Sequence, residues 1–126
     1  RQLYILTMET KHIKLTTEHR GGNTSTSFSG RPEGVRVRED LSLDDKAFDE
    51  KMYDLDIPSG TSAFNPSFFL GLLFPSIKTL GVDKFVSKYK FGLDELTPTL
   101  KSLINDDLQE GLRNASNEIC SSTGLD

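Results

Sequence analysis

The segment 53–91 constrains the fold of this chain more than any other part of the sequence. It begins with Tyr-Asp-Leu-Asp-Ile at residues 53–57, where apolar and acidic side chains alternate as they do in a half-buried strand. An almost unbroken apolar stretch follows at 68–80, and a second alternating run, Phe-Val-Ser-Lys-Tyr-Lys-Phe, occupies 85–91. Strand, helix and strand in this order have the length of a crossover unit. The sequence therefore predicts two parallel neighbouring strands with a right-handed connection.

The helix of this crossover has clear end signals. Asn65 is a favourable N-cap and Pro66 suits the first helical position, so we expect the helix to begin there. Gly81 is a typical C-terminal stop. Pro75 lies inside the helix and lacks a backbone donor, so it predicts a kink or a split. Apolar residues lie all round the helix, which predicts burial on most sides.

Shorter patterns complete the prediction. The run 20–34 is rich in Gly, Ser, Thr and Pro and reads as a loop, and a second helix is expected from Thr97 and Pro98 through Leu112. The expected fold is α/β, with a small mixed sheet of about four strands and helices packed on one face. Its remaining elements are strands at 12–15 and 35–38 and a brief helix at 43–50 capped by Ser42. We predict an N-terminal extension or first strand start at 1–11, one domain at 12–113 and a flexible tail at 114–126.

Size and charge limit the function classes. The chain has 126 residues, which fits one domain, and a net charge of −4, which argues against a nucleic-acid partner. No apolar run reaches 18 residues, so no membrane association is expected. The single cysteine, Cys120, cannot form an internal disulfide, and no secretion signal is recognisable at the N-terminus. These features predict a cytoplasmic protein.

Short motifs resemble a known family. Ser59-Gly60 follows the acidic-apolar strand, Asn-Pro-Ser-Phe-Phe opens the helix at 65–69, and Gly30-Arg31 and Gly34-Val35-Arg36 precede them. Together they resemble the bacterial STAS-like domains of unknown function, which are related in fold to the anti-sigma-factor antagonists, over about residues 12–113. The resemblance implies a non-catalytic regulatory or protein-interaction module that docks through the turn around residues 59–69. It also implies a protein partner, such as a histidine-kinase-type ATPase.

Five side chains of this turn are the candidate regulatory or interaction residues. In the phosphorylatable antagonists the regulated serine directly follows an aspartate, but here Asn65 and Pro66 occupy those two positions. Ser67 is then the nearest hydroxyl, at a helix end that favours anions. The alternative is an ordinary first-turn serine below an Asn65 cap. The candidates are Ser59, Thr61, Ser62, Asn65 and Ser67.

A second hypothesis places a phosphate or nucleotide site at the helix start, because arginines are frequent in and after the polar loop. The candidate anion contacts are Arg20, Arg31, Arg36 and Arg38. The alternative is a surface loop beside a basic strand. A third hypothesis is a structural homodimer assembled through the apolar rim of the helix segment 68–74.

Catalytic and metal sites are not expected. His12 and His19 both precede the Ser-Gly turn, which lacks the Gly-x-Ser-x-Gly pattern of a nucleophile elbow. The two histidines and one cysteine do not have the spacing of a zinc site, and no calcium-loop or phosphate-loop motif is present. We therefore expect no cofactor.

Overall fold

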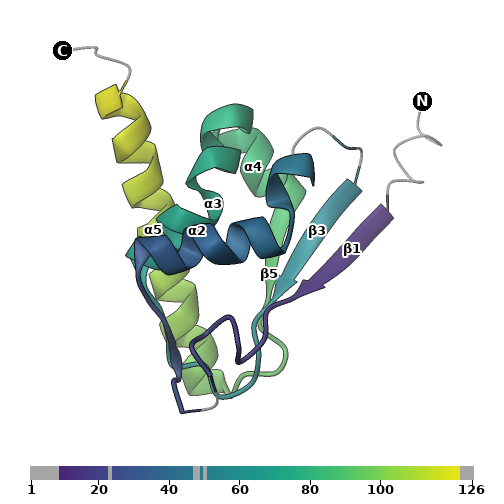
Figure 1. Cartoon of the computed structure of the whole chain (residues 1–126), viewed down its shortest axis with the longest axis vertical. Helices are drawn as coiled ribbons and strands as arrows, with labels where there is room; N and C mark the ends of the chain where they lie inside the picture. The colour runs from purple at the N-terminus through teal and green to yellow at the C-terminus, as the bar shows by residue number, and fades with distance from the viewer. Residues whose placement is uncertain (1–8, 23, 47–48, 50, 123–126) are drawn as a thin grey trace.

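The structure is a computed structural model that describes residues 9–22, 24–46, 49 and 51–122 (Figure 1). Most of the predicted N-terminal segment 1–11 and the last four residues of the predicted tail lie outside these residues. The described part is mixed α/β. Its elements are β1 (Glu9–Lys14), β2 (Ser27–Phe28), α2 (Arg31–Asp40), a 3-10 turn (Leu43–Lys46), β3 (Lys51–Asp56), β4 (Ala63–Phe64), α3 (Pro66–Leu80), α4 (Val82–Lys88), β5 (Tyr89–Gly92) and α5 (Pro98–Ser122).

The predicted crossover is confirmed. β3 and β5 are parallel neighbours, with Tyr53 in register with Tyr89 and Leu55 in register with Phe91. The Asn65 side chain caps α3 by accepting a hydrogen bond from the Ser67 amide, Pro66 opens the helix, and the chain leaves it at Gly81. Of the two outcomes predicted for Pro75, a kink or a split, the split is wrong, because α3 continues through Pro75 to Leu80.

The prediction of one mixed sheet with about four strands is also wrong. The described residues form a three-stranded sheet in the order β1-β3-β5, in which all pairs are parallel, and a separate parallel pair, β2 and β4. The run 35–38, predicted as a strand, lies inside α2. Four alternating residues do not separate a strand from a helix face, and the helix start at Pro32 decides the matter.

Three other predicted boundaries shift. The run 85–91 begins as helix α4 and becomes a strand only at Tyr89. The helix predicted at 43–50 is a 3-10 turn at 43–46, while residues 47, 48 and 50 lie outside the described part. α5 continues to Ser122 instead of ending near Leu112, and Ala115 is fully buried, so much of the predicted tail is a packed helix.

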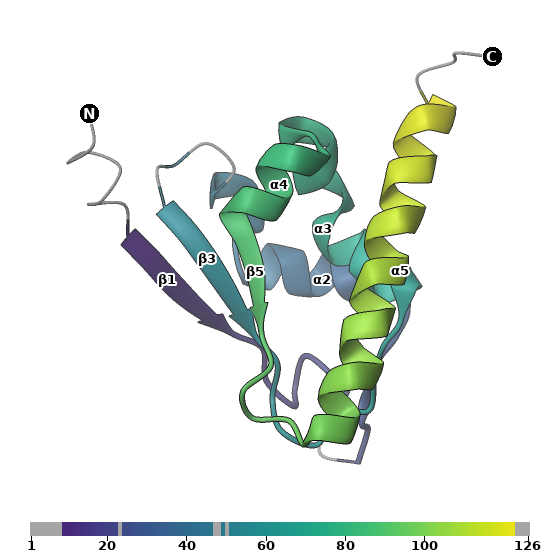
Figure 2. The same cartoon turned by 180° about the vertical axis from the view of Figure 1, so that it is seen from behind.

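α3 is the centre of the packing (Figures 1 and 2). It contacts both α2 and α5, and its aromatic residues meet the buried face of the sheet, where the Phe69 ring lies 6.3 Å from that of Phe91. The opposite face of the sheet carries polar residues of all three strands: His12, Asp54, Asp56 and Lys90. No helix in the described part of the chain combines the length and apolarity needed to cross a bilayer.

Two glycines set the closeness of α2 to α3. A Cβ at Gly34 would lie 2.4 Å from the Phe68 carbonyl oxygen, and one at Gly71 would lie 2.1 Å from the Arg31 carbonyl oxygen. Both contacts are with backbone, which cannot yield as a side chain can. The two helices therefore cross with their backbones almost touching, and this fixes α2 over the start of α3.

Candidate functional site

The turn from β3 to α3 is a tight, ordered connection. Gly60 has φ 80°, a left-handed conformation that glycine adopts without strain. The Thr61 side chain is fully buried, and its hydroxyl donates to the Pro58 carbonyl at 2.8 Å. Ser59 is exposed. Two neighbouring hydroxyls of the predicted site thus differ in role: Thr61 holds the turn together from inside, and Ser59 faces solvent.

The Arg20 side chain holds this turn in place through hydrogen bonds. It is only 7% exposed, and its guanidinium donates to the Thr61 hydroxyl at 2.7 Å, the Ser59 carbonyl at 3.2 Å and the Ser25 carbonyl at 2.7 Å. All three acceptors are neutral. We call Arg20 with these acceptors the Arg20 anchor. It ties the polar loop after β1 to the turn after β3, because one planar fork of donors reaches both segments.

The same two segments meet again in the β2–β4 pair. The Thr26 and Ser62 hydroxyls lie 2.8 Å apart, and the Ser62 amide donates to the Thr26 carbonyl at 2.7 Å. The Asn65 amide donates to the Phe28 carbonyl at 2.8 Å, which places the start of α3 beside β2. We call the polar residues of these two segments and of the start of α3 the hydroxyl surface: Thr26, Ser27, Ser29, Ser59, Ser62, Asn65 and Ser67.

The four arginines predicted to contact an anion do not converge. Arg20 is bound in its anchor, and Arg38 is 5% exposed and donates to the Leu72 carbonyl and the Ser76 hydroxyl. Arg31 pairs with Glu118 at 3.3 Å, and Arg36 pairs with Glu33. Arg36 also lines a hollow of about 490 Å³, but carboxylates of Glu18 and Asp40 line it too, which offsets its attraction for an anion. The arginine arrangement does not favour the nucleotide hypothesis.

The histidines are also engaged. The His19 Nδ1 accepts from the Thr16 amide at 3.1 Å, and its Nε2 lies 2.9 Å from the Asp40 carboxylate. Both ring nitrogens are therefore used, which leaves no position to take a proton from a serine. His12 lies on the open face of the sheet, with Nδ1 3.0 Å from Asp56. No group of three or more His, Cys, Asp or Glu side chains in the described residues is placed to hold a metal ion.

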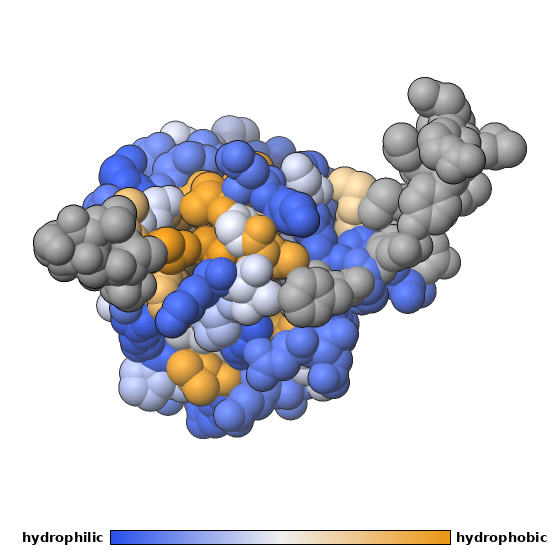
Figure 3. Space-filling model, turned by 90° about the horizontal axis from the view of Figure 1, so that it is seen from above, coloured by the Kyte–Doolittle hydropathy of each residue, from blue (hydrophilic) through white to orange (hydrophobic). Residues whose placement is uncertain are grey.

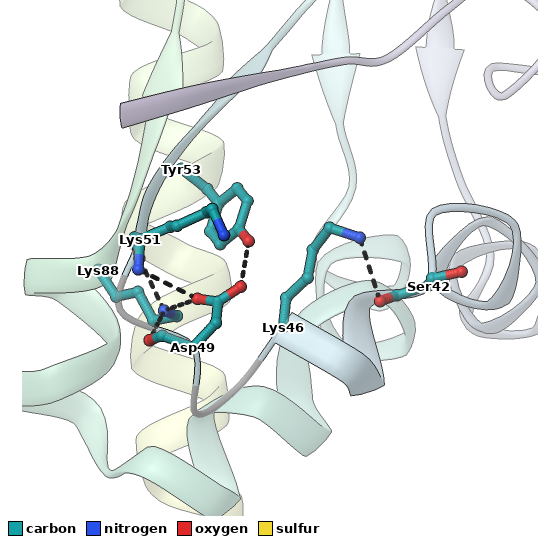
Figure 4. Close-up of polar contacts among 6 residues, drawn as sticks. All are labelled: Ser42, Lys46, Asp49, Lys51, Tyr53 and Lys88. Carbon is teal, nitrogen blue, oxygen red and sulfur yellow. Dashed lines mark hydrogen bonds and ion pairs between the residues drawn. The ribbon is translucent and has the colours of Figure 1, made fainter. Parts of the chain in front are cut away.

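A partly buried cation, Lys88, lies where β3 and β5 begin (Figure 4). The Lys88 Nζ donates to the Asp49 carboxylate at 2.6 Å and to the carbonyls of Asp49 and Lys51 at 2.9 and 2.7 Å. The Tyr53 hydroxyl donates to the other Asp49 oxygen. We call this group the Lys88 anchor. Burial opposes the charge of Asp49, but hydrogen bonds from Lys88, Tyr53 and the Lys51 amide together hold the pKa of Asp49 below its ordinary value.

Tyr89 stacks on Tyr53 within the same region, with ring centroids 5.5 Å apart. Its hydroxyl is buried without a hydrogen-bond partner of suitable geometry among the described residues. Burial, and next the negative charge of Asp49, raise the pKa of Tyr89, while Arg38 and Ser76 offset part of that rise. Sequence reasoning missed both anchors. Their one signal was the presence of Arg20 and Lys88 beside segments that must become buried.

Comparisons with known proteins add no relative. Searches against protein-family models, curated proteins and solved structures find no match to this chain.

Proposed function

We propose that this chain is a non-catalytic, STAS-like interaction module that presents the hydroxyl surface to a protein partner in the cytoplasm. The observation that carries the proposal is the Arg20 anchor. It holds together two segments far apart in sequence, and Ser59, Asn65 and Ser67 are exposed in and after the second of them. A face that is ordered before binding loses less conformational entropy when a partner docks, which favours affinity.

The chemistry of this surface favours recognition over catalysis. Its groups are hydroxyls and one amide, which donate and accept hydrogen bonds but do not take up protons near neutral pH. His19 directly precedes Arg20, and both of its ring nitrogens already form hydrogen bonds, with the Thr16 amide and the Asp40 carboxylate. Hydrogen-bonding side chains at a rigid turn suit a protein surface that supplies complementary donors and acceptors.

The STAS-like resemblance suggests the partner class, a histidine-kinase-type ATPase, with competitive docking as the mechanism.

The packing of α3 supports this face over the homodimer hypothesis. Phe68, Phe69, Leu72 and Leu73 are buried within the chain itself, and Phe74 lies under the Arg31 guanidinium at 5.6 Å. Most of the apolar side chains of the segment 68–74 therefore pack inside the chain itself, and Leu70 and Phe74 are the ones left partly exposed among these residues.

Site-specific photocrosslinking tests the proposal. A photoreactive residue is placed at Ser59 or Ser67 in the native host, with Lys101, an exposed residue of α5, as the matched control position. The proposal expects one protein to be crosslinked from both surface positions and not from position 101. Equal crosslinking from all three positions, or none from 59 and 67, would contradict it.

A further inference from the structure

The outer edge of β5 has backbone groups without partners. β5 pairs with β3 on one side, and the Ile57 amide donates to the Gly92 carbonyl at 2.9 Å. Alternate residues of a strand direct their backbone groups to opposite sides, so Lys90 and Gly92 face β3 while Phe91 faces away. In the described part of the chain, no group pairs with the Phe91 amide or carbonyl. Such an edge is a template for a further strand.

An apolar groove runs beside this edge. It has a volume of about 260 Å³ and lies between β5, α4 and α5, with Phe69 of α3 contributing to it. Its walls include Val86, which is 43% exposed, and Leu108 and Leu112 of α5. The hydrogen bond from the Phe64 amide to Asp107 ties α5 to β4, so this wall is held in place. Apolar surface gathers inside a polar rim on the end of the molecule seen from above (Figure 3).

The charge of the groove selects its occupant. Among the residues that the structure describes, Lys90 is the only charged one that lines the groove, and Asn105 and Gln109 supply neutral amides from α5. Lys90 forms no ion pair among the described residues, and its Nζ donates to the Val86 carbonyl at 3.2 Å. An acidic group therefore fits beside Lys90.

β3 shows the matching pattern on the other side of β5. Asp54 is in register with Lys90 on the open face of the sheet, and Leu55 is in register with Phe91 on the buried face. A strand added at the outer edge would meet the same two residues. It would place an apolar side chain in the groove and its neighbour, on the open face, beside Lys90.

We propose that the β5 edge and this groove bind an extended peptide segment of a partner protein, in which an apolar residue adjoins an acidic one. The peptide adds a strand to the sheet through the free backbone groups of Phe91, and side-chain contacts in the groove supply specificity. This surface is separate from the hydroxyl surface, and its binding does not depend on the function proposed above.

Selection from a phage-displayed library of random octapeptides against the whole chain tests this proposal. We expect enriched sequences that pair an apolar residue with an acidic neighbour. Synthetic peptides of these sequences are expected to perturb the amide resonances of residues 89–93. N-methylation at alternate backbone nitrogens, in the register that faces β5, is expected to weaken binding about tenfold or more, because it removes the donors of strand pairing.

Two exposed apolar residues provide a matched pair of variants. Val86→Asp is expected to weaken peptide binding about tenfold, because it places a charge in the apolar wall of the groove. Lys90→Gln is expected to weaken binding about threefold, because it removes the positive charge beside the acidic residue of the peptide. Leu103→Asp is the control, since Leu103 is 47% exposed but does not line the groove. Equal thermal melting of the two aspartate variants establishes that both fold.

Three results would overturn the proposal. The first is an absence of enrichment, and the second is undiminished binding of the N-methylated peptides, which would mean that the groove takes side chains without strand pairing. The third is a wild type that is dimeric by light scattering together with a Val86→Asp variant that is monomeric, which would assign the edge to a second copy of this chain.

Discussion

Arg20 and Lys88 each join two segments of this chain, but they do so through different kinds of acceptor. The Arg20 anchor joins the loop after β1 to the turn after β3 through neutral oxygens only. The Lys88 anchor joins the start of β3 to α4 through a carboxylate as well as two carbonyls. Arg20 has a rigid fork of donors that suits several neutral acceptors, whereas the compact ammonium of Lys88 has a charged partner.

The difference lies in what each anchor leaves behind when it is broken. Without Arg20, the buried Thr61 hydroxyl and two partly buried carbonyls lose a donor. Without Lys88, the Asp49 carboxylate is still 26% exposed and can be hydrated. The Arg20 anchor should therefore matter more for stability, and the Lys88 anchor should be the one that responds to acid.

Loss of Arg20 should have the largest effect. Arg20→Met is expected to lower the free energy of unfolding by about 3 kcal/mol, since the buried Thr61 hydroxyl and two partly buried carbonyls lose their donor at once. Urea denaturation followed by circular dichroism measures the change. Arg20→Lys, which keeps the charge but not the fork, should recover only part of it. An Arg20→Met variant as stable as the wild type would show that the anchor is dispensable.

Loss of Lys88 should cost less. Lys88→Met is expected to lower the free energy of unfolding by about 2 kcal/mol, because Asp49 loses its ion pair but keeps some contact with water. The same denaturation experiment applies. Lys84→Met in the same helix is the control, since Lys84 is exposed. A greater loss than that of Arg20→Met would reverse the proposed order of the two anchors.

Removal of the Tyr89 hydroxyl should act in the opposite direction. Tyr89→Phe is expected to stabilise the fold by about 1 kcal/mol at neutral pH, because a buried hydroxyl without a partner carries a desolvation cost. The wild type should also lose stability as the pH rises above 10. The raised pKa of Tyr89 lets the unfolded chain ionise first, and the variant lacks this dependence. Destabilisation at pH 7 would mean that Ser76 accepts a hydrogen bond from this hydroxyl.

Lowering the pH should weaken the Lys88 anchor and not the Arg20 anchor, and this is the smallest of the expected effects on stability. The pKa of Asp49 is held below 3.8 in the folded chain, so its contribution is present above that pH and is lost as the pH falls through the folded value. Thermal melts of wild type and Asp49→Asn between pH 6 and about 2.5 should therefore converge below pH 4. Because Asp49 is partly exposed, we expect a difference below about 1 kcal/mol. If the melting temperatures of the wild type and Asp49→Asn fell in parallel with pH, Asp49 would not be the source of the loss of stability in acid.

The sequence predicts the crossover well because several local signals agree there. Alternation at 53–57 predicts the strand that is β3 (Lys51–Asp56), the Asn65 cap predicts the start of α3, and Gly81 predicts its end. Val35 and Val37 misled because a run of four alternating residues fits a helix face as well as a strand. The Arg38 side chain of α2 is buried against α3, where it donates to Leu72 and Ser76, and this contact, which no local pattern encodes, favours the helix.

The candidate site was predictable in part. The exposure of Ser59 and Ser67 agrees with a surface turn, but the burial of Thr61 depends on Arg20, which lies 41 residues earlier. Contacts of this range depend on the whole fold and leave no periodic signal. The groove at β5 depends likewise on where α5 lies beside β5, and the sequence pattern predicts the helix but not this placement.

The crossing of α2 and α3 at Gly34 and Gly71 also restricts how this protein can vary through evolution. A single step to alanine at either position places a methyl group against the backbone of the other helix, so neither glycine can drift alone. Compensation would require the whole α2 segment to move outward, and the Arg38 contacts with Leu72 and Ser76 would then be lost. A divergent homologue should therefore keep small residues at both positions even where its surface has changed entirely.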